Sequence, residues 1–457
     1  MFEPSAQIEA LLTAVAVASR PSAAPSGTPI QAAMTDRESE FPNPLAATLT
    51  RIALDPYGRQ VADQFLDTFW SGQARRQDVL SSSDAGREVI IGSGFHAAVY
   101  AAVRVLSGYP RPLVLERDER AGGTFAMTAR PTFHLNSRNR PGIGGLAGDQ
   151  RASLNYLPGA PIQAANLSMA EYQTNTDMAF VVRLTLAQFA DVVTNAEVLS
   201  VAGDAAGDTR LVIDVADRGR VLAGRVIDAR GVGDPADQNI ANGTTILTFA
   251  QSMQRMARPW PLRGVRRVAV IGGGDSARCG VESFLGIAPQ PFMAAAALDS
   301  IDLIDWYADQ LPTTCEQWQR CIRGRYQAIG RYLRPDRLGL RRLNVLSRRA
   351  QPIALPGLGL VGGRAYDLVL LCTGNRETTI PGLDLDSFDE YATDTTTTAD
   401  VVARKHYALP VFRVGPHARL PFTDLEREDG TADDAANAVS IFRTASKTAA
   451  LAATLPF

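Results

Sequence analysis

Two glycine-rich stretches carry the clearest chemistry in this chain of 457 residues. The first reads Gly92-Ser93-Gly94-Phe95-His96-Ala97 and follows the short apolar segment 88–91. In such a G-x-G-x-x-A loop the first glycine makes the tight turn from strand to helix, and the second lets the backbone approach a pyrophosphate. The start of the following helix favours bound phosphate. The loop predicts a dinucleotide site, with a structural turn that binds nothing as the alternative. The expected contacts are Gly92, Gly94, Phe95, His96 and Ala97.

A carboxylate stands where a site of this kind needs one. The apolar segment 112–115 reads as a second strand, and it ends in Glu116. A carboxylate at that place can accept hydrogen bonds from the hydroxyls of a ribose. Strand, glycine loop, helix, strand and acid follow one another within about 30 residues, the length of a β-α-β unit. Glu116 and its neighbour Arg117 therefore join the expected cofactor-binding residues.

The second glycine-rich stretch reads Gly272-Gly273-Gly274-Asp275-Ser276-Ala277 and follows the apolar segment 268–271. The same argument predicts a second dinucleotide, bound by Gly272, Gly274, Asp275 and Ser276. The choice between NADH and NADPH stays open. Asp305, at the end of the strand expected at 301–304, would favour NADH because a carboxylate repels a 2′-phosphate. Arg323, in an arginine-rich stretch, would instead bind that phosphate, unless it lies on a solvated helix face.

The bulk properties exclude several classes of function. There are 46 basic and 48 acidic residues with no basic stripe, so nucleic acid is not an expected partner. No stretch approaches ~20 uninterrupted apolar residues, and no basic region precedes the apolar run 8–17, so we expect a cytoplasmic protein without membrane contact. The four cysteines form no C-x-x-C pair and the four histidines show no ligand spacing, so no metal site is expected.

Further short motifs surround the two loops. Ala121-Gly122-Gly123-Thr124-Phe125 follows the acid, and Phe412-Arg413-Val414-Gly415-Pro416 lies near the end of the chain. Two others, Val226-Ile227-Asp228-Ala229-Arg230-Gly231 and Leu370-Leu371-Cys372-Thr373-Gly374, are similar to the A-T-G strands at which a chain crosses between domains.

In this combination the chain resembles the class B flavoprotein monooxygenases, which include flavin-containing monooxygenases, amine N-hydroxylases and Baeyer–Villiger enzymes. The resemblance implies an α/β fold with two Rossmann-like dinucleotide-binding domains, the NAD(P) domain being inserted in the FAD domain. It adds Gly123, Thr124, Gly374, Gly415 and Asn437 to the expected cofactor-binding residues. Asn437 would begin a helix that faces the flavin. The expected units are a flexible arm (1–50), a helical extension (51–86), the FAD domain (87–262 and 377–457) and the NAD(P) domain (263–376).

The resemblance also implies a reaction. NAD(P)H would reduce FAD, and O2 would form a flavin C4a-hydroperoxide that oxygenates a small nucleophilic substrate such as an amine. Two departures qualify this expectation. Arg230 stands where the family has threonine, and the family's F-x-G-x-x-x-H motif is absent, which argues against Baeyer–Villiger chemistry.

A polar stretch, His134-Leu135-Asn136-Ser137-Arg138-Asn139-Arg140, is the expected reaction centre. Asn136 and Ser137 would bond flavin, nicotinamide or a peroxide, and His134 is a candidate general acid/base. The alternatives are that these residues cap a buried turn and that His134 is structural. Two other functions remain open: a flavin reductase or dehydrogenase without oxygen insertion, and a non-catalytic flavoprotein. The N-terminal region, residues 1–80, would either make a homo-oligomer contact or cover the active site.

Overall fold

The computed structural model describes a set of ranges that include the first glycine loop and, of the second, Gly272 and the residues from Asp275 on. These are residues 44–74, 87–126, 134–138, 157, 159–167, 172–203, 210–231, 233–236, 240–242, 244–256, 264–272, 275–285, 298–305, 343–347, 360–361, 364–376, 378–383 and 411–415.

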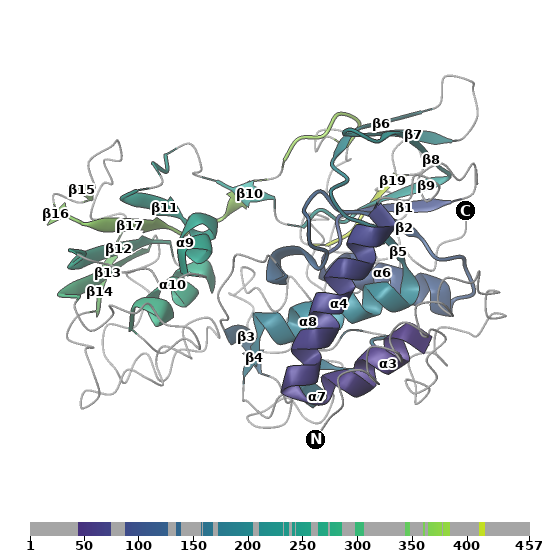
Figure 1. The fold of residues 1–457 in the computed structure, drawn as a ribbon. Helices are drawn as coiled ribbons and strands as arrows, with labels where there is room; N and C mark the ends of the chain where they lie inside the picture. The colour runs from purple at the N-terminus through teal and green to yellow at the C-terminus, as the bar shows by residue number, and fades with distance from the viewer. Residues whose placement is uncertain are drawn as a thin grey trace, which may run out of the picture.

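The first sheet is parallel throughout and has the strand order β19-β9-β1-β2-β5. Its central strand β1 is buried along its whole length, as expected for an apolar run covered on both faces. Strand β19 comes from near the end of the chain and lies beside β9 (Figure 1). The strands are β1 (Glu88–Ile91), β2 (Leu113–Leu115), β5 (Asp191–Val193), β9 (Arg225–Asp228) and β19 (Val411–Arg413).

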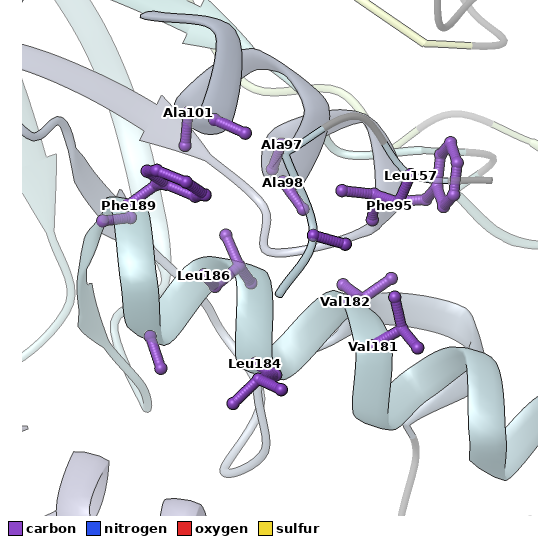
Figure 2. Packing of buried hydrophobic residues seen from close by; sticks show 14 of the residues in the cluster. Phe95, Ala97, Ala98, Ala101, Leu157, Val181, Val182, Leu184, Leu186 and Phe189 are labelled. Atoms are coloured by element: carbon purple, nitrogen blue, oxygen red, sulfur yellow. The ribbon is translucent and has the colours of Figure 1, made fainter. Parts of the chain in front are cut away.

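Two helices, α6 (Phe95–Leu106) and α8 (Asn175–Phe189), pack against each other in the core beside this sheet (Figure 2). The small side chains of Ala97, Ala98 and Ala101 on α6 allow a close approach. Helix α8 begins at a side-chain cap, since the Thr174 hydroxyl accepts a hydrogen bond from the backbone N–H of Asp177 at 3.2 Å. The expected helix over 95–106 is confirmed.

Two further helices precede the first sheet. Helices α3 (Pro44–Ala53) and α4 (Pro56–Ala74) pack on each other and on α8. Both begin at proline, which is favoured at the first helical position because its missing N–H would have no partner there. The boundary expected at residue 50 between arm and helical extension lies within α3.

A three-stranded antiparallel sheet leads into β9. It contains β6 (Val198–Gly203), β7 (Leu211–Val215) and β8 (Gly219–Ala223), and a turn over residues 216–218 joins the last two strands. The chain leaves this sheet at Gly224, whose N–H donates to the Arg87 carbonyl, and continues as β9 in the parallel sheet.

The second parallel sheet has the order β11-β17-β12-β13-β14 and carries helices α9 and α10 (Figure 1). Strand β11 of this sheet and helix α9 come before residue 263, the expected start of the NAD(P) domain. The sequence does not indicate β11, because this strand has only three residues and no glycine loop follows it. The elements are β11 (Ile246–Thr248), α9 (Phe249–Met256), β12 (Arg267–Ile271), α10 (Asp275–Leu285), β13 (Ser300–Asp305), β14 (Leu343–Ser347) and β17 (Leu368–Leu371).

The chain passes between the two sheets at a short antiparallel pair, β10 (Asp234–Pro235) with β18 (Asn375–Arg376). Figure 1 shows β10 between the two parts. The expected α/β fold with two Rossmann-like units, one inserted in the other, is confirmed. Six short elements complete the described chain, namely η1 (Gly123–Phe125), β3 (His134–Arg138) with β4 (Tyr172–Thr174), α7 (Ala164–Leu167), and β15 (Leu360–Val361) with β16 (Arg364–Ala365). Among the described helices, none has the length and apolar character that crossing a bilayer requires.

Candidate dinucleotide sites

The carboxyl ends of four parallel strands bring distant residues to one edge of the first sheet. Gly92 follows β1, Glu116 follows β2, Arg230 lies just beyond β9, and Gly415 lies just beyond β19. Ligands of open α/β sheets bind outside this edge. Gly92 has φ +94°, and a Cβ there would lie 2.8 Å from the Ala229 carbonyl oxygen. Only glycine fits this turn.

Gly94 and Gly123 lie against each other at the start of α6. A Cβ on Gly123, which has φ +63°, would lie 2.7 Å from the Gly94 Cα atom. A Cβ on Gly94 itself would have its nearest protein atom at 4.0 Å. Gly94 is also the N-cap of α6 and has ordinary extended backbone. Gly123 thus closes one side of the Gly94 backbone and leaves open the space that a Cβ would enter.

Glu116 is tied to the loop through Ser93, which the sequence reasoning missed. One carboxylate oxygen of Glu116 accepts from the Ser93 N–H at 3.0 Å and from the Ser93 hydroxyl, and the other accepts from the Asp118 N–H at 3.0 Å. The Ser93 hydroxyl in turn accepts from the Gly122 N–H at 2.9 Å. Burial raises the pKa of Glu116, and the hydrogen bonds from Asp118 and Ser93 act in the opposite direction. The sequence feature that could have predicted this contact is the hydroxyl of Ser93 at the variable position of the G-x-G motif.

Among the remaining residues expected at the first site, some pack in the hydrophobic core and others lie beside the glycine turns. The side chains of Phe95 and Ala97 belong to the hydrophobic core, so only their backbone groups are available to a ligand. His96 is buried and lies against Gly415, where a Cβ would be 3.3 Å from the imidazole Nδ1. Thr124 is exposed at the end of the Gly122–Gly123 segment. The expected residues Gly92, Gly94, His96, Glu116, Gly123 and Gly415 are therefore brought together.

Arg230 has a specific partner at the first crossing. Its guanidinium donates to both oxygens of Asp228, at 2.8 and 3.0 Å, and Arg413 pairs with the same carboxylate at 3.1 Å. Burial alone would raise the pKa of Asp228, but Arg230 and Arg413 outweigh it and bring the pKa below its ordinary value of 3.8. Arg413 thus joins β19 to β9 through Asp228, while Arg230 binds the same carboxylate and donates to the Thr378 carbonyl.

Arg117 and Gly374 lie at the crossings rather than at the glycine loop. The exposed Arg117 pairs with Asp234 at 2.8 Å, and Asp234 also accepts from the Thr378 hydroxyl at 2.7 Å. The hydrogen bond to Asp234 raises the pKa of Arg117. The Gly374 carbonyl accepts from the Ala236 N–H at 3.0 Å. These contacts join the two chain segments that connect the domains.

The second loop repeats the tight turn of the first. Gly272 has φ +127°, and a Cβ there would overlap the Cys372 carbonyl group. Gly280, one helical turn after Ser276, lets α10 approach the sheet, because a Cβ there would lie 2.6 Å from Leu370. Ala277 is fully buried, as expected of its position, and Ser276 is half-buried. The buried Asp302 accepts from the Tyr366 hydroxyl at 2.5 Å.

Several expected site residues are described only in part or not at all. Asp275 is the first residue of α10 and Asp305 the last of β13, but their side chains lie outside the described residues. The same holds for His134, Asn136 and Ser137, whose strand β3 pairs antiparallel with β4. Gly274, Arg323 and Asn437 lie outside the described residues altogether.

No family model and no curated protein sequence matches the chain. Among solved structures, it is similar to a flavin-containing monooxygenase from Stenotrophomonas maltophilia, with 18% identity over 79% of this chain and 96% of that chain, at a TM-score of 0.46. It is also similar to a cadaverine monooxygenase from Erwinia amylovora, with 11% identity over 80% of this chain and 94% of that chain, at a TM-score of 0.49. A bacillithiol disulfide reductase from Staphylococcus aureus is similar with 11% identity over 80% of this chain and 97% of that chain, at a TM-score of 0.47.

Proposed function

We propose that the protein is an FAD-dependent oxidoreductase that takes hydride from NAD(P)H. The convergence of Gly92, Gly94, Glu116, Gly123 and Gly415 at one sheet edge is the observation that carries this proposal. A Cβ on Gly94 would lie 4.0 Å from the nearest atom of the described residues, the Gly123 Cα, which leaves the room a pyrophosphate needs at a helix N-terminus. The residues present therefore fit a dinucleotide.

Each part of the first site has a separate task. The first turn of α6 directs backbone N–H groups toward the bound phosphates, and its dipole favours their charge. Glu116 accepts a ribose hydroxyl. Among its described contacts one oxygen accepts two hydrogen bonds and the other accepts one, which leaves an acceptor position on the second. When bound, FAD supplies the redox chemistry, accepting hydride from the nicotinamide.

The second site serves the nicotinamide cofactor in the same way. The tight turn at Gly272 brings α10 to the carboxyl edge of the second sheet, and Ser276 in its first turn is half-buried. We assign Gly272, Gly274, Asp275 and Ser276 to the NAD(P)H phosphates. Asp305 at the end of β13 would select NADH, and Arg323 would select NADPH.

The finer part of the proposal is a monooxygenase reaction. One atom of O2 goes to a small nucleophilic substrate such as an amine, and the other leaves as water with the two electrons of NAD(P)H. Its support is the polar strand His134–Arg138, in which Asn136 and Ser137 offer hydrogen bonds and His134 a proton. A reductase without oxygen transfer is the second candidate, because two dinucleotide sites suffice for it.

Gly94→Ala tests the first site with little disturbance of the fold. Within the described part of the chain the new methyl group meets no atom closer than 4.0 Å, and the extended backbone of Gly94 accepts a side chain without strain. We expect the apoprotein to keep its melting temperature within a few degrees while FAD binding, followed by flavin fluorescence, is lost. Full FAD occupancy in this variant, or a wild-type protein that takes up no FAD, would overturn the proposal.

Isotope-labelled O2 separates the two finer functions. A monooxygenase incorporates label into its product, and NAD(P)H consumption matches product formation. With a panel of primary amines as substrates, a reductase instead oxidises NAD(P)H and returns all the consumed oxygen as hydrogen peroxide. Complete recovery of oxygen as peroxide with every amine would exclude the monooxygenase.

A further inference from the structure

Helix α4 carries two carboxylates that hold two arginines from different parts of the chain. Arg183 of α8 is fully buried; its Nε lies 3.1 Å from Asp63 and its Nη2 lies 2.6 Å from Asp67. Arg120, from the segment after β2, pairs with the same two carboxylates, its Nε lying 3.3 Å from Asp67. We call these four residues, Asp63, Asp67, Arg120 and Arg183, the α4 cluster. Its two positive and two negative charges balance.

The arginines of the α4 cluster reach the backbone that closes on Gly94. A Cβ on Gly122 would lie 3.0 Å from the Arg183 Cγ atom, so the aliphatic part of that arginine lies directly beside this glycine. The Arg183 guanidinium lies 5.3 Å from the centre of the buried Trp70 ring, also on α4. Arg120 belongs to the same segment, two residues before Gly122.

The chain of contacts continues from this segment into the dinucleotide site. The Gly122 N–H donates to the Ser93 hydroxyl, which donates to Glu116, and Gly123 packs on Gly94. Every one of these partners lies at the phosphate or ribose end of the proposed FAD site. Helix α4 is therefore linked to that site by two independent arginines.

We propose that α4 is a working part of the dinucleotide site, with Asp63 and Asp67 as positioning residues that hold segment 120–123 against Gly94 through Arg120 and Arg183. This inference rests on the proposed function. It gives the N-terminal helices a task in cofactor binding that is separate from oligomer contacts or covering the active site.

Arg120→Gln and Arg59→Gln form a matched pair of variants. Arg120→Gln removes the ion pairs with Asp63 and Asp67 of α4, and Arg59→Gln removes the ion pair between Arg59 of α4 and Asp177. The two arginine side chains are 20% and 18% exposed. Arg59 pairs with Asp177 on α8 and has no described contact with segment 120–123. We expect similar falls in apoprotein melting temperature. The FAD dissociation constant should rise by about tenfold for Arg120→Gln and by less than about twofold for Arg59→Gln.

Arg120→Lys, which keeps the charge, should recover most of the lost affinity. If Arg120→Gln and Arg59→Gln bind FAD equally well, or if both lose affinity in proportion to their melting temperatures, the inference is overturned and the helices are structural only. A wild-type protein that does not bind FAD would instead defeat the proposed function itself.

Discussion

Gly123 approaches Gly94 so closely that a single added methyl group on Gly123 would lie 2.7 Å from the Gly94 Cα atom. The two glycines come from different turns, one after β2 and one after β1, and their contact fixes how the second turn covers the first. A contact between backbones cannot be relieved by moving a side chain. This relationship gives the first prediction.

Gly123→Ala should lower both stability and FAD affinity. Its positive φ costs about 1–2 kcal/mol for a residue with a Cβ, and the overlap adds about 1–3 kcal/mol. Gly219→Ala is the control, because Gly219 has φ +84° with nothing within 4 Å of an added Cβ. Melting temperature and flavin titration should show a larger fall for Gly123→Ala, and equal effects would contradict the assigned contact.

Gly272→Ala should abolish reduction by NAD(P)H while FAD stays bound. The new Cβ would overlap the Cys372 carbonyl group and push the loop off the end of β17, in a sheet separate from the FAD site. The control is Gly264→Ala, since Gly264 also has a positive φ, +81°, and no atom of the described residues lies within 4 Å of an added Cβ. Anaerobic bleaching of the flavin by NADH and NADPH is the measurement. Normal bleaching in Gly272→Ala would show that this loop does not serve the nicotinamide.

Asp228 should stabilise the fold above about pH 4 and lose this effect in acid. Because Arg230 and Arg413 hold its pKa below 3.8, the unfolded chain binds a proton in the window below that value while the folded chain does not. The contribution of the carboxylate is therefore complete above 3.8 and lost as pH falls through the lower, folded pKa.

The variant Asp228→Asn measures this contribution directly. At pH 7 it leaves the buried Arg413 and the half-buried Arg230 without their carboxylate, which costs about 3–5 kcal/mol. The gap in urea midpoint between wild type and variant should be constant from pH 7 to about pH 4.5 and shrink below about pH 4. A gap that widens in acid would contradict the lowered pKa.

Tyr366→Phe should destabilise the second domain by about 1–3 kcal/mol, since it removes a donor from the buried Asp302. Tyr57→Phe is the control, because that side chain is 75% exposed and its loss of a hydroxyl should change little. Thermal unfolding followed by circular dichroism compares the two, and equal melting temperatures would show that the hydrogen bond adds nothing.

The local parts of this fold were predictable from the sequence, and the long-range parts were not. The strand 88–91, the turn at Gly92 and the helix 95–106 follow from neighbouring residues, and all are present. The α4 cluster joins residues 63, 67, 120 and 183, which no local pattern connects. The sequence shows that Arg230 replaces an expected threonine. It does not show the carboxylate that Arg230 binds, Asp228, or that Arg413 binds the same carboxylate in the folded chain.

Ser93 is an instructive omission within a motif that was otherwise recognised. The G-x-G pattern treats its middle position as free, because side chains there differ among proteins that share the loop. In this chain the hydroxyl joins Glu116 to Gly122 and is fully buried, so the variable position carries a contact as specific as the glycines.

The position of β19 sets an order for folding during synthesis. The strands of the inserted domain end at residue 371, whereas the first sheet stays one strand short until Val411–Arg413 leaves the ribosome and pairs with β9. The inserted domain can thus finish its sheet while the surrounding one still exposes the edge of β9, where a holding chaperone would bind. A chain truncated after residue 400 and released from the ribosome should therefore protect β12 from protease and leave β9 open to it.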